Sequence, residues 1–369
     1  MGLERPRIRP EILGFEPYSP GLTIGEITRQ YKLDRVVKMA SNENPLGASP
    51  MAVEAIERHA GLSFRYPQAG NPVLTEALSS HLGVQQGCIV PGNGSDELID
   101  LLVRVTARPG CDNIVVCDPS FSIYSMQAAL CGVEVRRVPL GQGHSLPLAE
   151  LLKAADQNTG LVFVTTPDNP SGVATPAVEL EKMARDLPRD TLLVIDEAYV
   201  EFTRPRGRFD NLCWWTEDHP VVILRTFSKM YGLAGLRLGY GVMPGWLADC
   251  LLRVRLPFSV NLLAEKAGCA ALKDEAFVRK TLETVLAGRD FLKGGLEGLG
   301  CRVTPSQANF LLFKPPGPAR QIFEQLLAKG VIVRPLAGYG LPDHLRVSMG
   351  TDEENRFFLN ALQEVLDHG

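Results

Sequence analysis

Lys229 stands in a segment whose composition suits an amine nucleophile. The strand-like run Val221–Thr226 leads directly to Ser228 and Lys229, and Arg237 follows eight residues after the lysine. A lysine held at a strand end among small residues can lose solvation, which favours its neutral, nucleophilic form. A guanidinium close by can hold a phosphate through two N–H groups. The segment therefore indicates amine chemistry beside an anion, although taken alone it also fits an ordinary solvated loop.

Two further strand-like runs end in polar residues. Leu192–Asp196 ends in a carboxylate, and Tyr199 follows three residues later. Leu161–Thr165 leads into the turn TTPDNPSG, which carries Asn169. A buried carboxylate needs a cationic partner, and ligands of parallel sheets bind outside the carboxyl ends of the strands. We therefore expect these side chains to converge on one crevice, although each alone could be a strand cap or a plain turn.

A glycine-rich turn opens a helix-like segment at Pro91–Leu102, PGNGSDELIDLL. The first turn of that helix carries Ser95 and Asp96. Free N–H groups at the start of a helix can bind a phosphate, although either residue could equally be a simple N-cap. Glu97 stands where a dinucleotide-binding fingerprint would have its third glycine, which argues against a nicotinamide cofactor.

Together and in this order, these segments resemble the fold-type-I pyridoxal-phosphate (PLP) enzymes, the aspartate aminotransferase superfamily. The order is a phosphate-binding turn, an N-P-x-G turn, D-x-x-Y at a strand end, and a Ser-Lys pair with an arginine eight residues later. Within the superfamily the chain is similar to the histidinol-phosphate aminotransferase subgroup. Further motifs of that subgroup are PYSPG (Pro17–Gly21), ASNENPLGASP (Ala40–Pro50), FRYPQAG (Phe64–Gly70), DPSFSIY (Asp118–Tyr124) and LRVSMGT (Leu345–Thr351).

The resemblance implies roles for four residues around the cofactor ring. Lys229 matches the lysine that bonds covalently to PLP and later moves a proton. Asp196 matches the carboxylate that keeps the pyridine nitrogen protonated, so that the ring withdraws electrons. Asn169 and Tyr199 match donors to the phenolic oxygen of the cofactor. Asn169 is also expected to contact the substrate.

The resemblance also implies how the rest of the cofactor and the substrate are held. Four residues are expected around the cofactor phosphate: Ser95, Asp96, Ser228 and Arg237. Phe121 matches an aromatic ring that stacks on the pyridine, where many relatives have tyrosine. Tyr66 matches a tyrosine that reaches the phosphate in the neighbouring subunit, which predicts a homodimer with shared active sites. Arg346 matches the arginine that binds the substrate carboxylate.

Two more residues are candidates for the substrate pocket. Arg334 ends the strand-like run VIVR, twelve residues before Arg346, and could point at the same spot. A phosphate dianion is better held by two cations than by one, so we expect Arg334 to bind a substrate phosphate, unless it only caps its strand. Tyr18 could line the pocket or simply pack.

The elements that must position these residues form two kinds of pattern. Through the middle of the chain, β-branched runs alternate with helix-like stretches, which is typical of an α/β sheet. The last third has a long helix-like pattern at residues 274–299 and strand-like runs at residues 308–313, 331–334 and 345–348. With the resemblance, this predicts an aspartate-aminotransferase-like α/β fold (PLP fold type I) with a mostly parallel central sheet. We expect residues 41–270 to form the large PLP-binding domain and residues 1–40 plus 271–369 a smaller α+β domain.

Composition excludes several other classes of protein. A net charge of −4 supplies no basic field to hold nucleic acid or an anionic membrane. The eight cysteines form no C-x-x-C pair and the six histidines show no ligand spacing, so we expect no metal. The charged start MGLERPRIRP does not read as a signal peptide, and no apolar run approaches the ~20 residues of a membrane span. Scattered thiols then predict a cytoplasmic protein.

The expected reaction is transamination between histidinol phosphate and 2-oxoglutarate, giving imidazole acetol phosphate and glutamate, a step of histidine biosynthesis. The motifs leave an aromatic amino-acid aminotransferase open, because it would be built on the same frame. A threonine-phosphate decarboxylase is a second alternative, although the S-N-E-N-P-L-G segment favours the aminotransferase. A regulatory PLP-binding module is a third, and the presence of both Lys229 and Arg346 argues against it.

Overall fold

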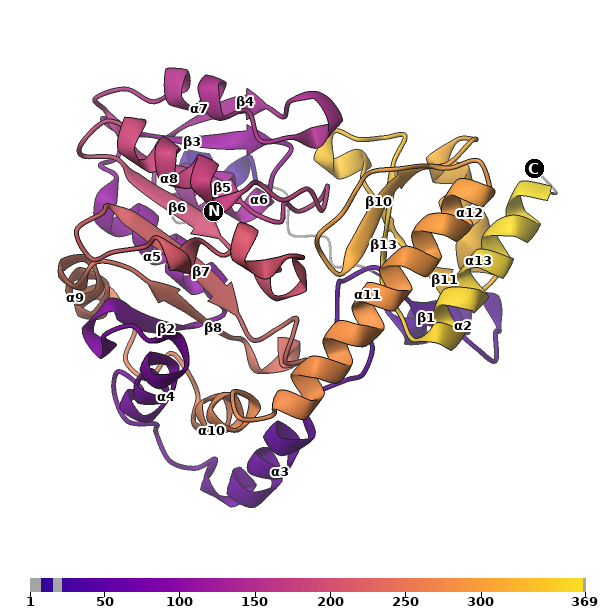
Figure 1. The fold of residues 1–369 in the computed structure, drawn as a ribbon, viewed down its shortest axis with the longest axis horizontal. Helices are drawn as coiled ribbons and strands as arrows, with labels where there is room; N and C mark the ends of the chain where they lie inside the picture. Colours follow the sequence, from indigo (N-terminus) through magenta and orange to yellow (C-terminus); the bar gives the residue numbers. More distant parts are fainter. Residues whose placement is uncertain (1–7, 16–21, 368–369) are drawn as a thin grey trace, which may run out of the picture.

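The computed structural model describes residues 8–15 and 22–367, which form a larger and a smaller lobe (Figure 1). The larger lobe is built on a seven-stranded sheet in the order β2-β8-β7-β6-β5-β3-β4. Within this sheet β8 alone runs antiparallel to its neighbours, and the other strands are parallel. The strands are β2 (Ile89–Asn93), β3 (Asn113–Asp118), β4 (Glu134–Pro139), β5 (Thr159–Thr165), β6 (Leu192–Asp196), β7 (Val221–Thr226) and β8 (Leu238–Val242).

Apolar side chains on both faces of this sheet are covered by helices. Successive residues of a strand point to opposite faces, so Ile114 and Val116 join one buried cluster while Val115 and Cys117 join the other. This explains why the strands read as continuous apolar runs, as parallel strands buried on both faces do. The first cluster includes α5 (Ser95–Thr106), α6 (Ser122–Leu130) and α9 (Gly245–Val254), and the second includes α3 (Pro50–His59), α4 (Pro72–Leu82), α7 (Leu148–Ala154), α8 (Ala177–Asp186) and α10 (Leu262–Ala271).

The smaller lobe contains an antiparallel four-stranded sheet in the order β12-β13-β10-β9. A separate parallel pair joins β1 to β11. The single strand predicted at residues 331–334 is therefore divided, because its first half pairs with β1 and its second half pairs with β13. The elements are β1 (Val37–Lys38), β9 (Arg302–Val303), β10 (Phe310–Lys314), β11 (Val331–Ile332), β12 (Arg334–Pro335), β13 (Leu345–Ser348), α2 (Ile24–Tyr31), α12 (Ala319–Ala328) and α13 (Asp352–Asp367). The short helix α1 (Pro10–Leu13) instead contacts α6 of the larger lobe.

The long helix α11 (Glu275–Gly298) runs along the boundary between the lobes (Figure 1). Its N-cap Asp274 accepts a hydrogen bond from the N–H of Phe277, which stabilises the first turn. It packs against α13 and β10 of the smaller lobe and against the turn Val200–Phe202 of the larger one. The helix thus joins the two lobes, and the domain boundaries predicted after residues 40 and 270 stay a prediction. Its buried side recurs every three or four residues, at Phe277, Thr281, Val285, Gly288, Leu292 and Leu296.

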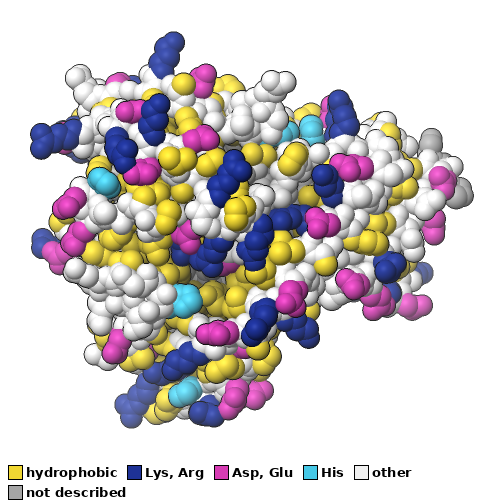
Figure 2. All heavy atoms as spheres, viewed as in Figure 1, with side chains coloured by type: hydrophobic (Ala, Val, Ile, Leu, Met, Phe, Trp, Pro, Cys, Tyr) yellow, Lys and Arg dark blue, Asp and Glu magenta, His cyan; other side chains and the backbone are white. Residues whose placement is uncertain are grey.

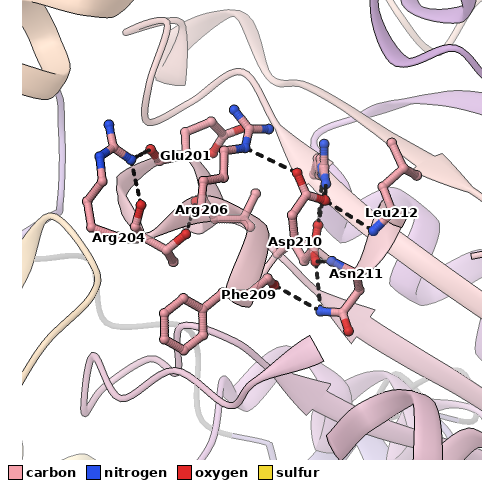
Figure 3. Close-up of polar contacts among 11 residues, drawn as sticks. Glu201, Arg204, Arg206, Phe209, Asp210, Asn211 and Leu212 are labelled. Atoms are coloured by element: carbon pink, nitrogen blue, oxygen red, sulfur yellow. Dashed lines mark hydrogen bonds and ion pairs between the residues drawn. The ribbon is translucent and has the colours of Figure 1, made fainter. Parts of the chain in front are cut away.

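A buried ion pair fastens β6 to β7 near their carboxyl ends. Arg225 of β7 is 2% exposed and donates from Nε to Glu197 Oε2 at 2.8 Å. The other oxygen of Glu197 accepts from the backbone and side chain of Asn211 at 2.8 and 2.9 Å. Arg225 also pairs with Asp210, a carboxylate that Arg206 reaches from the surface side (Figure 3). Every charge in this cluster therefore has a partner, which a buried charge requires.

Replacing Arg225 tests how much this cluster contributes. Arg225→Met keeps the apolar stem but leaves Glu197 buried without its cation. We expect the free energy of unfolding to fall by about 3–5 kcal/mol, measured by chemical denaturation at a fixed protein concentration.

A matched control comes from an exposed pair. Arg320 on α12 lies 3.0 Å from Glu324, with side chains 89% and 58% exposed. Arg320→Met should change the free energy of unfolding by no more than about 0.5 kcal/mol. Equal losses in the two variants would contradict the structural weight given to Arg225.

Candidate active site

The carboxyl ends of β5, β6 and β7 open onto a cavity of about 220 Å³ where the two lobes meet. Basic and apolar side chains gather near the middle of the face that Figure 2 shows, at the junction of the lobes. Most residues predicted for the site lie around this one cavity. They are Ser95, Asp96, Phe121, Asn169, Asp196, Tyr199, Ser228, Lys229, Arg237, Arg334 and Arg346.

One predicted residue that the structure describes does not line the cavity. Tyr66 is 80% exposed, and its ring stacks on Phe258 with the ring centroids 4.7 Å apart. Tyr18 lies outside the described residues. The structure of a single chain therefore gathers the predicted cofactor and carboxylate residues but leaves Tyr66 on the surface.

Lys229 reaches the cavity from the loop after β7. Its Nζ donates to the carbonyl oxygen of Ser41 at 3.2 Å. Asn44 holds the loop itself, because its amide donates to the carbonyl oxygens of Lys229 at 3.2 Å and Met230 at 2.8 Å. Burial, followed by the positive charge of Arg346, lowers the pKa of Lys229 from 10.5 to about 8. The amine is therefore far more often neutral near physiological pH than an ordinary lysine, which suits it as a nucleophile or base.

Asp196 lies at the end of β6 and is 4% exposed. Burial raises its pKa to about 6, although hydrogen bonds from the Tyr124 hydroxyl and the Ala198 N–H act in the opposite direction. The Tyr124 hydroxyl donates to Asp196 Oδ2 at 2.7 Å and lies 2.9 Å from Thr165 Oγ1. A cation bound in the cavity beside this carboxylate would restore its ionised form.

Arg346 of β13 brings positive charge from the smaller lobe. It is 5% exposed, donates to Asn169 Oδ1, and donates to the carbonyl oxygen of Ala40 at 2.9 Å. Its guanidinium carbon lies 5.0 Å from the ring centroid of Phe310. Arg334 of β12 is the residue directly opposite Arg346 in the antiparallel ladder, and opposite residues share one face of a sheet. The two arginines therefore present their charges to the same end of the cavity.

The other end of the cavity is suited to an anion. Helix α5 begins at Ser95, after Gly94 with a φ of +78°, and its first N–H groups have no partner within the helix. Ser228 and Thr226 place hydroxyls there, 2.9 Å apart. Arg237 pairs with Asp96 at 3.0 Å. A Cβ added to Gly94 would lie 2.6 Å from the Arg237 guanidinium, so only glycine leaves that guanidinium in place.

Several residues that shape the cavity carried no predicted role. Tyr124 supports Asp196, and Ser41, Asn42 and Asn44 surround Lys229 and Tyr199. All four occur in recognised motifs, DPSFSIY and ASNENPLGASP. Nothing in those motifs says which side chain turns toward which partner, because the contacts join segments far apart in the chain.

No helix within residues 8–15 and 22–367 is long and apolar enough to cross a membrane. Nor does that part of the chain contain a group of three or more His, Cys, Asp or Glu side chains placed to hold a metal ion. All eight cysteines lie in described segments and are free thiols.

Comparison with known proteins gives consistent results over nearly the whole chain. Residues 34–362 match the family model of class I and II aminotransferases. A histidinol-phosphate aminotransferase from Nitratidesulfovibrio vulgaris (strain DP4) is 53% identical over 361 residues, which cover 98% of this chain and 97% of that protein.

Two solved structures illustrate the likeness in three dimensions. The histidinol-phosphate aminotransferase from Sinorhizobium meliloti in complex with pyridoxal-5′-phosphate superposes with a TM-score of 0.89 at 29% identity, over 98% of each chain. A Thermus thermophilus aspartate aminotransferase double mutant gives a TM-score of 0.84 at 24% identity, over 98% of this chain and all of the other. The second likeness is one of fold alone. The predicted aspartate-aminotransferase-like fold class is confirmed.

The acidity of Lys229 can be tested on protein prepared without cofactor. We expect the rate at which an amine-acylating reagent labels Lys229 to reach half its maximum near pH 8, against 10.5 for an ordinary lysine. The labelled peptide would be followed by mass spectrometry, with the exposed Lys293 of α11 reporting the decay of the reagent. Arg346→Gln should raise the midpoint, because it removes a neighbouring positive charge. A wild-type midpoint near 10.5 would contradict the effect of burial.

Proposed function

The chain belongs to the class I and II aminotransferase family, and we propose that it transfers an amino group between histidinol phosphate and 2-oxoglutarate, using pyridoxal 5′-phosphate. The products are imidazole acetol phosphate and glutamate, which places the enzyme in histidine biosynthesis. One observation carries the proposal: an unusually acidic lysine, a buried carboxylate and a helix N-terminus surround one cavity that two arginines close. The name of the 53% identical relative supports the choice of substrate.

The anion end of the cavity fits the phosphate of pyridoxal phosphate. The free N–H groups at the start of α5, with Ser95 and Ser228, supply hydrogen-bond donors. Arg237 supplies positive charge, and its pairing with Asp96 keeps it at that end of the cavity. The backbone of Asp96 suits the phosphate better than its carboxylate does, because two anions repel each other.

The middle of the cavity fits the ring. Asp196 has the raised pKa of a buried carboxylate in need of a cation, and a protonated pyridine nitrogen would provide one. Asn169 and Tyr199 line the same space and can donate to the phenolic oxygen. Phe121 is a half-buried ring on the wall of the cavity, where it can stack on the cofactor.

When bound, pyridoxal phosphate supplies an electron sink that stabilises negative charge at the substrate carbon next to nitrogen. The protein must then move a proton to and from that carbon. Lys229 Nζ is suited to this work, because a pKa of about 8 lets it hold or release a proton near neutral pH. Arg346 binds and orients the carboxylate of glutamate through its planar, doubly donating guanidinium. Tyr199 stays protonated, since burial raises its pKa to about 12, and so acts as a donor.

Two other activities remain as competing proposals. An aromatic amino-acid aminotransferase would use the same lysine, carboxylate and Arg346, and would have no need of a second arginine for a phosphate. A threonine-phosphate decarboxylase would hold the carboxylate bond, instead of the carbon–hydrogen bond, across the ring. The pairing of Arg334 with Arg346 favours a phosphorylated amino donor but does not distinguish histidinol phosphate from threonine phosphate.

A half-reaction screen tests the proposed substrate. The purified enzyme carrying pyridoxal phosphate would be mixed separately with histidinol phosphate, glutamate, phenylalanine, tyrosine and threonine phosphate. We expect histidinol phosphate and glutamate to convert the cofactor to its pyridoxamine form with the highest kcat/KM. Faster conversion by phenylalanine or tyrosine, or release of carbon dioxide from threonine phosphate, would favour the alternatives.

We propose that the enzyme is a cytoplasmic homodimer with shared active sites. Large apolar side chains stand exposed on the surface around Tyr66, with Phe64 and Leu256 each 73% exposed and Phe258 41% exposed. Exposed apolar residues in this number are typical of an association surface. The free thiols of all eight cysteines are compatible with a reducing compartment.

The role of Arg334 can be separated from that of Arg346 by comparing the two half-reactions. Arg334→Gln should lower kcat/KM for histidinol phosphate by roughly ten- to a hundredfold, because it removes a charge-assisted contact to the phosphate. The same substitution should lower kcat/KM for glutamate by a smaller factor. Arg346→Gln should damage both half-reactions.

Arg302 provides the control, since it is exposed on β9 of the same small sheet and does not line the cavity. Arg302→Gln should behave like the wild type with both substrates. Equal loss for the two substrates in Arg334→Gln, or no loss, would remove Arg334 from a phosphate site.

Subunit mixing tests whether Tyr66 acts in the neighbouring site. Tyr66→Ala and Lys229→Ala should each be nearly inactive as homodimers. In a mixed dimer one site has both groups intact, so random reassociation should restore activity in about one quarter of the sites. Activity that stays absent in a verified mixed dimer would place Tyr66 in its own subunit's site or outside the site.

A further inference from the structure

Asn42 is a buried residue whose every polar group is engaged. It is 2% exposed and has a φ of +55°, in the left-handed region. Its N–H donates to Ser348 Oγ at 2.8 Å, and its side-chain oxygen accepts from the same hydroxyl at 2.9 Å. Its carbonyl oxygen accepts from Asn309 Nδ2 at 3.1 Å. Its own Nδ2 donates to the Tyr199 hydroxyl oxygen at 3.1 Å.

These contacts connect the two parts of the site. Ser348 lies two residues after Arg346 on β13, so the two side chains point to the same face of the strand. Arg346 contacts the same N-terminal segment, through the carbonyl oxygen of Ala40. Tyr199 belongs to the larger lobe and lines the cavity beside Lys229. Asn42 thus joins the strand of the carboxylate-binding arginine to the tyrosine that faces the cofactor space.

The direction of the hydrogen bond to Tyr199 matters. The Ser348 hydroxyl accepts the Asn42 N–H and gives its single proton to the Asn42 side-chain oxygen. That arrangement leaves the amide nitrogen, which can only donate, facing Tyr199. The tyrosine oxygen therefore acts as acceptor toward Asn42, and its own proton stays free for a group in the cavity.

We propose that Asn42 is a positioning residue that directs the hydroxyl proton of Tyr199 into the cavity and ties it to the strand of Arg346. The inference rests on the proposed function, because the acceptor in the cavity is the phenolic oxygen of pyridoxal phosphate. Tyr199 is suited to the task, since burial keeps it protonated. A preoriented donor is worth more than one that must rotate into place.

The substitution Asn42→Asp reverses the hydrogen bond with little change of shape. Aspartate also tolerates a positive φ, and it can still accept from Ser348. Its second oxygen can only accept when ionised, so it would draw the Tyr199 proton away from the cavity. The variant should therefore behave like Tyr199→Phe while keeping the tyrosine ring.

The measurement is the pH midpoint of the absorbance change of the bound cofactor in the holoenzyme. A donated hydrogen bond stabilises the deprotonated, anionic chromophore, so its loss should raise the midpoint by about one pH unit. Asn42→Asp and Tyr199→Phe should give shifts of similar size. A double variant that combines Tyr199→Phe with the uncharged Asn42→Gly should shift no further than either single one, because both remove the same bond and neither adds a charge.

The outcomes distinguish the inference from the proposed function. If wild-type protein shows no pH-dependent cofactor band, the proposed function fails. If Tyr199→Phe shifts the midpoint but Asn42→Asp does not, or if the shifts of Tyr199→Phe and Asn42→Gly add in full in the double variant, only the role of Asn42 is overturned. Thr106→Ala removes a hydroxyl hydrogen bond on α5 to the carbonyl of Leu102 and should leave the midpoint unchanged.

A second variant covers the case in which Asn42→Asp does not fold. Asn42→Gly accepts the positive φ without strain and removes the amide altogether. It should raise the midpoint in the same direction, and an unchanged midpoint would overturn the proposal. Thermal unfolding of each variant would show that the spectral shift is not a consequence of lost stability.

Discussion

The cost of burying charge governs this site. Asp196, Lys229 and Arg346 face one small cavity between the lobes, and burial pushes the pKa of the carboxyl up and that of the amine down. Each pKa shift shows how strongly burial disfavours the charged form that the group adopts in water. A cavity with such groups favours a ligand that carries a cation for the carboxylate and an anion for the arginine. The electrostatics of the site therefore already describe the ligand that it fits.

Holding these groups in place requires rigid support from outside the cavity. The buried pair of Glu197 and Arg225 fastens β6 to β7. Strand β6 carries Asp196, and β7 leads to the loop that carries Lys229. The segment Ala40–Asn44 contacts Lys229, Tyr199 and Arg346 through its backbone and side chains. That segment hydrogen-bonds both to β13, at Arg346 and Ser348, and to Tyr199 of the larger lobe, so it links the small sheet to the chemical groups. The same segment therefore positions both the chemical groups and the arginine proposed to bind the substrate carboxylate.

Residues at strand ends could be predicted from the sequence, and residues that act through tertiary contacts could not. Asp196, Asn169 and Lys229 follow apolar runs whose burial is readable, and parallel strands bring their ends to one edge. The sequence does not predict strands β2 and β8, because the glycines and proline of IVPGN and LGYGV interrupt the run of apolar residues that indicates a strand. Tyr124 and Asn42 were missed because helix-start and loop residues give no sign of the partner they meet. Arg334 lies opposite Arg346 because β12 pairs with β13. The spacing of the two arginines in the sequence does not determine that pairing.

On the proposed function, the two lobes carry different parts of the site, which would let one fold serve different substrates. The larger lobe carries Lys229 and Asp196, and neither of these needs to change when the substrate changes. The small sheet carries Arg334 and Arg346 directly opposite each other, and two like charges at such positions favour an anion bound between them. On the proposed role of Arg334 in binding a substrate phosphate, losing or moving this arginine would alter the choice of substrate, while Lys229 and Asp196 of the larger lobe would stay in place.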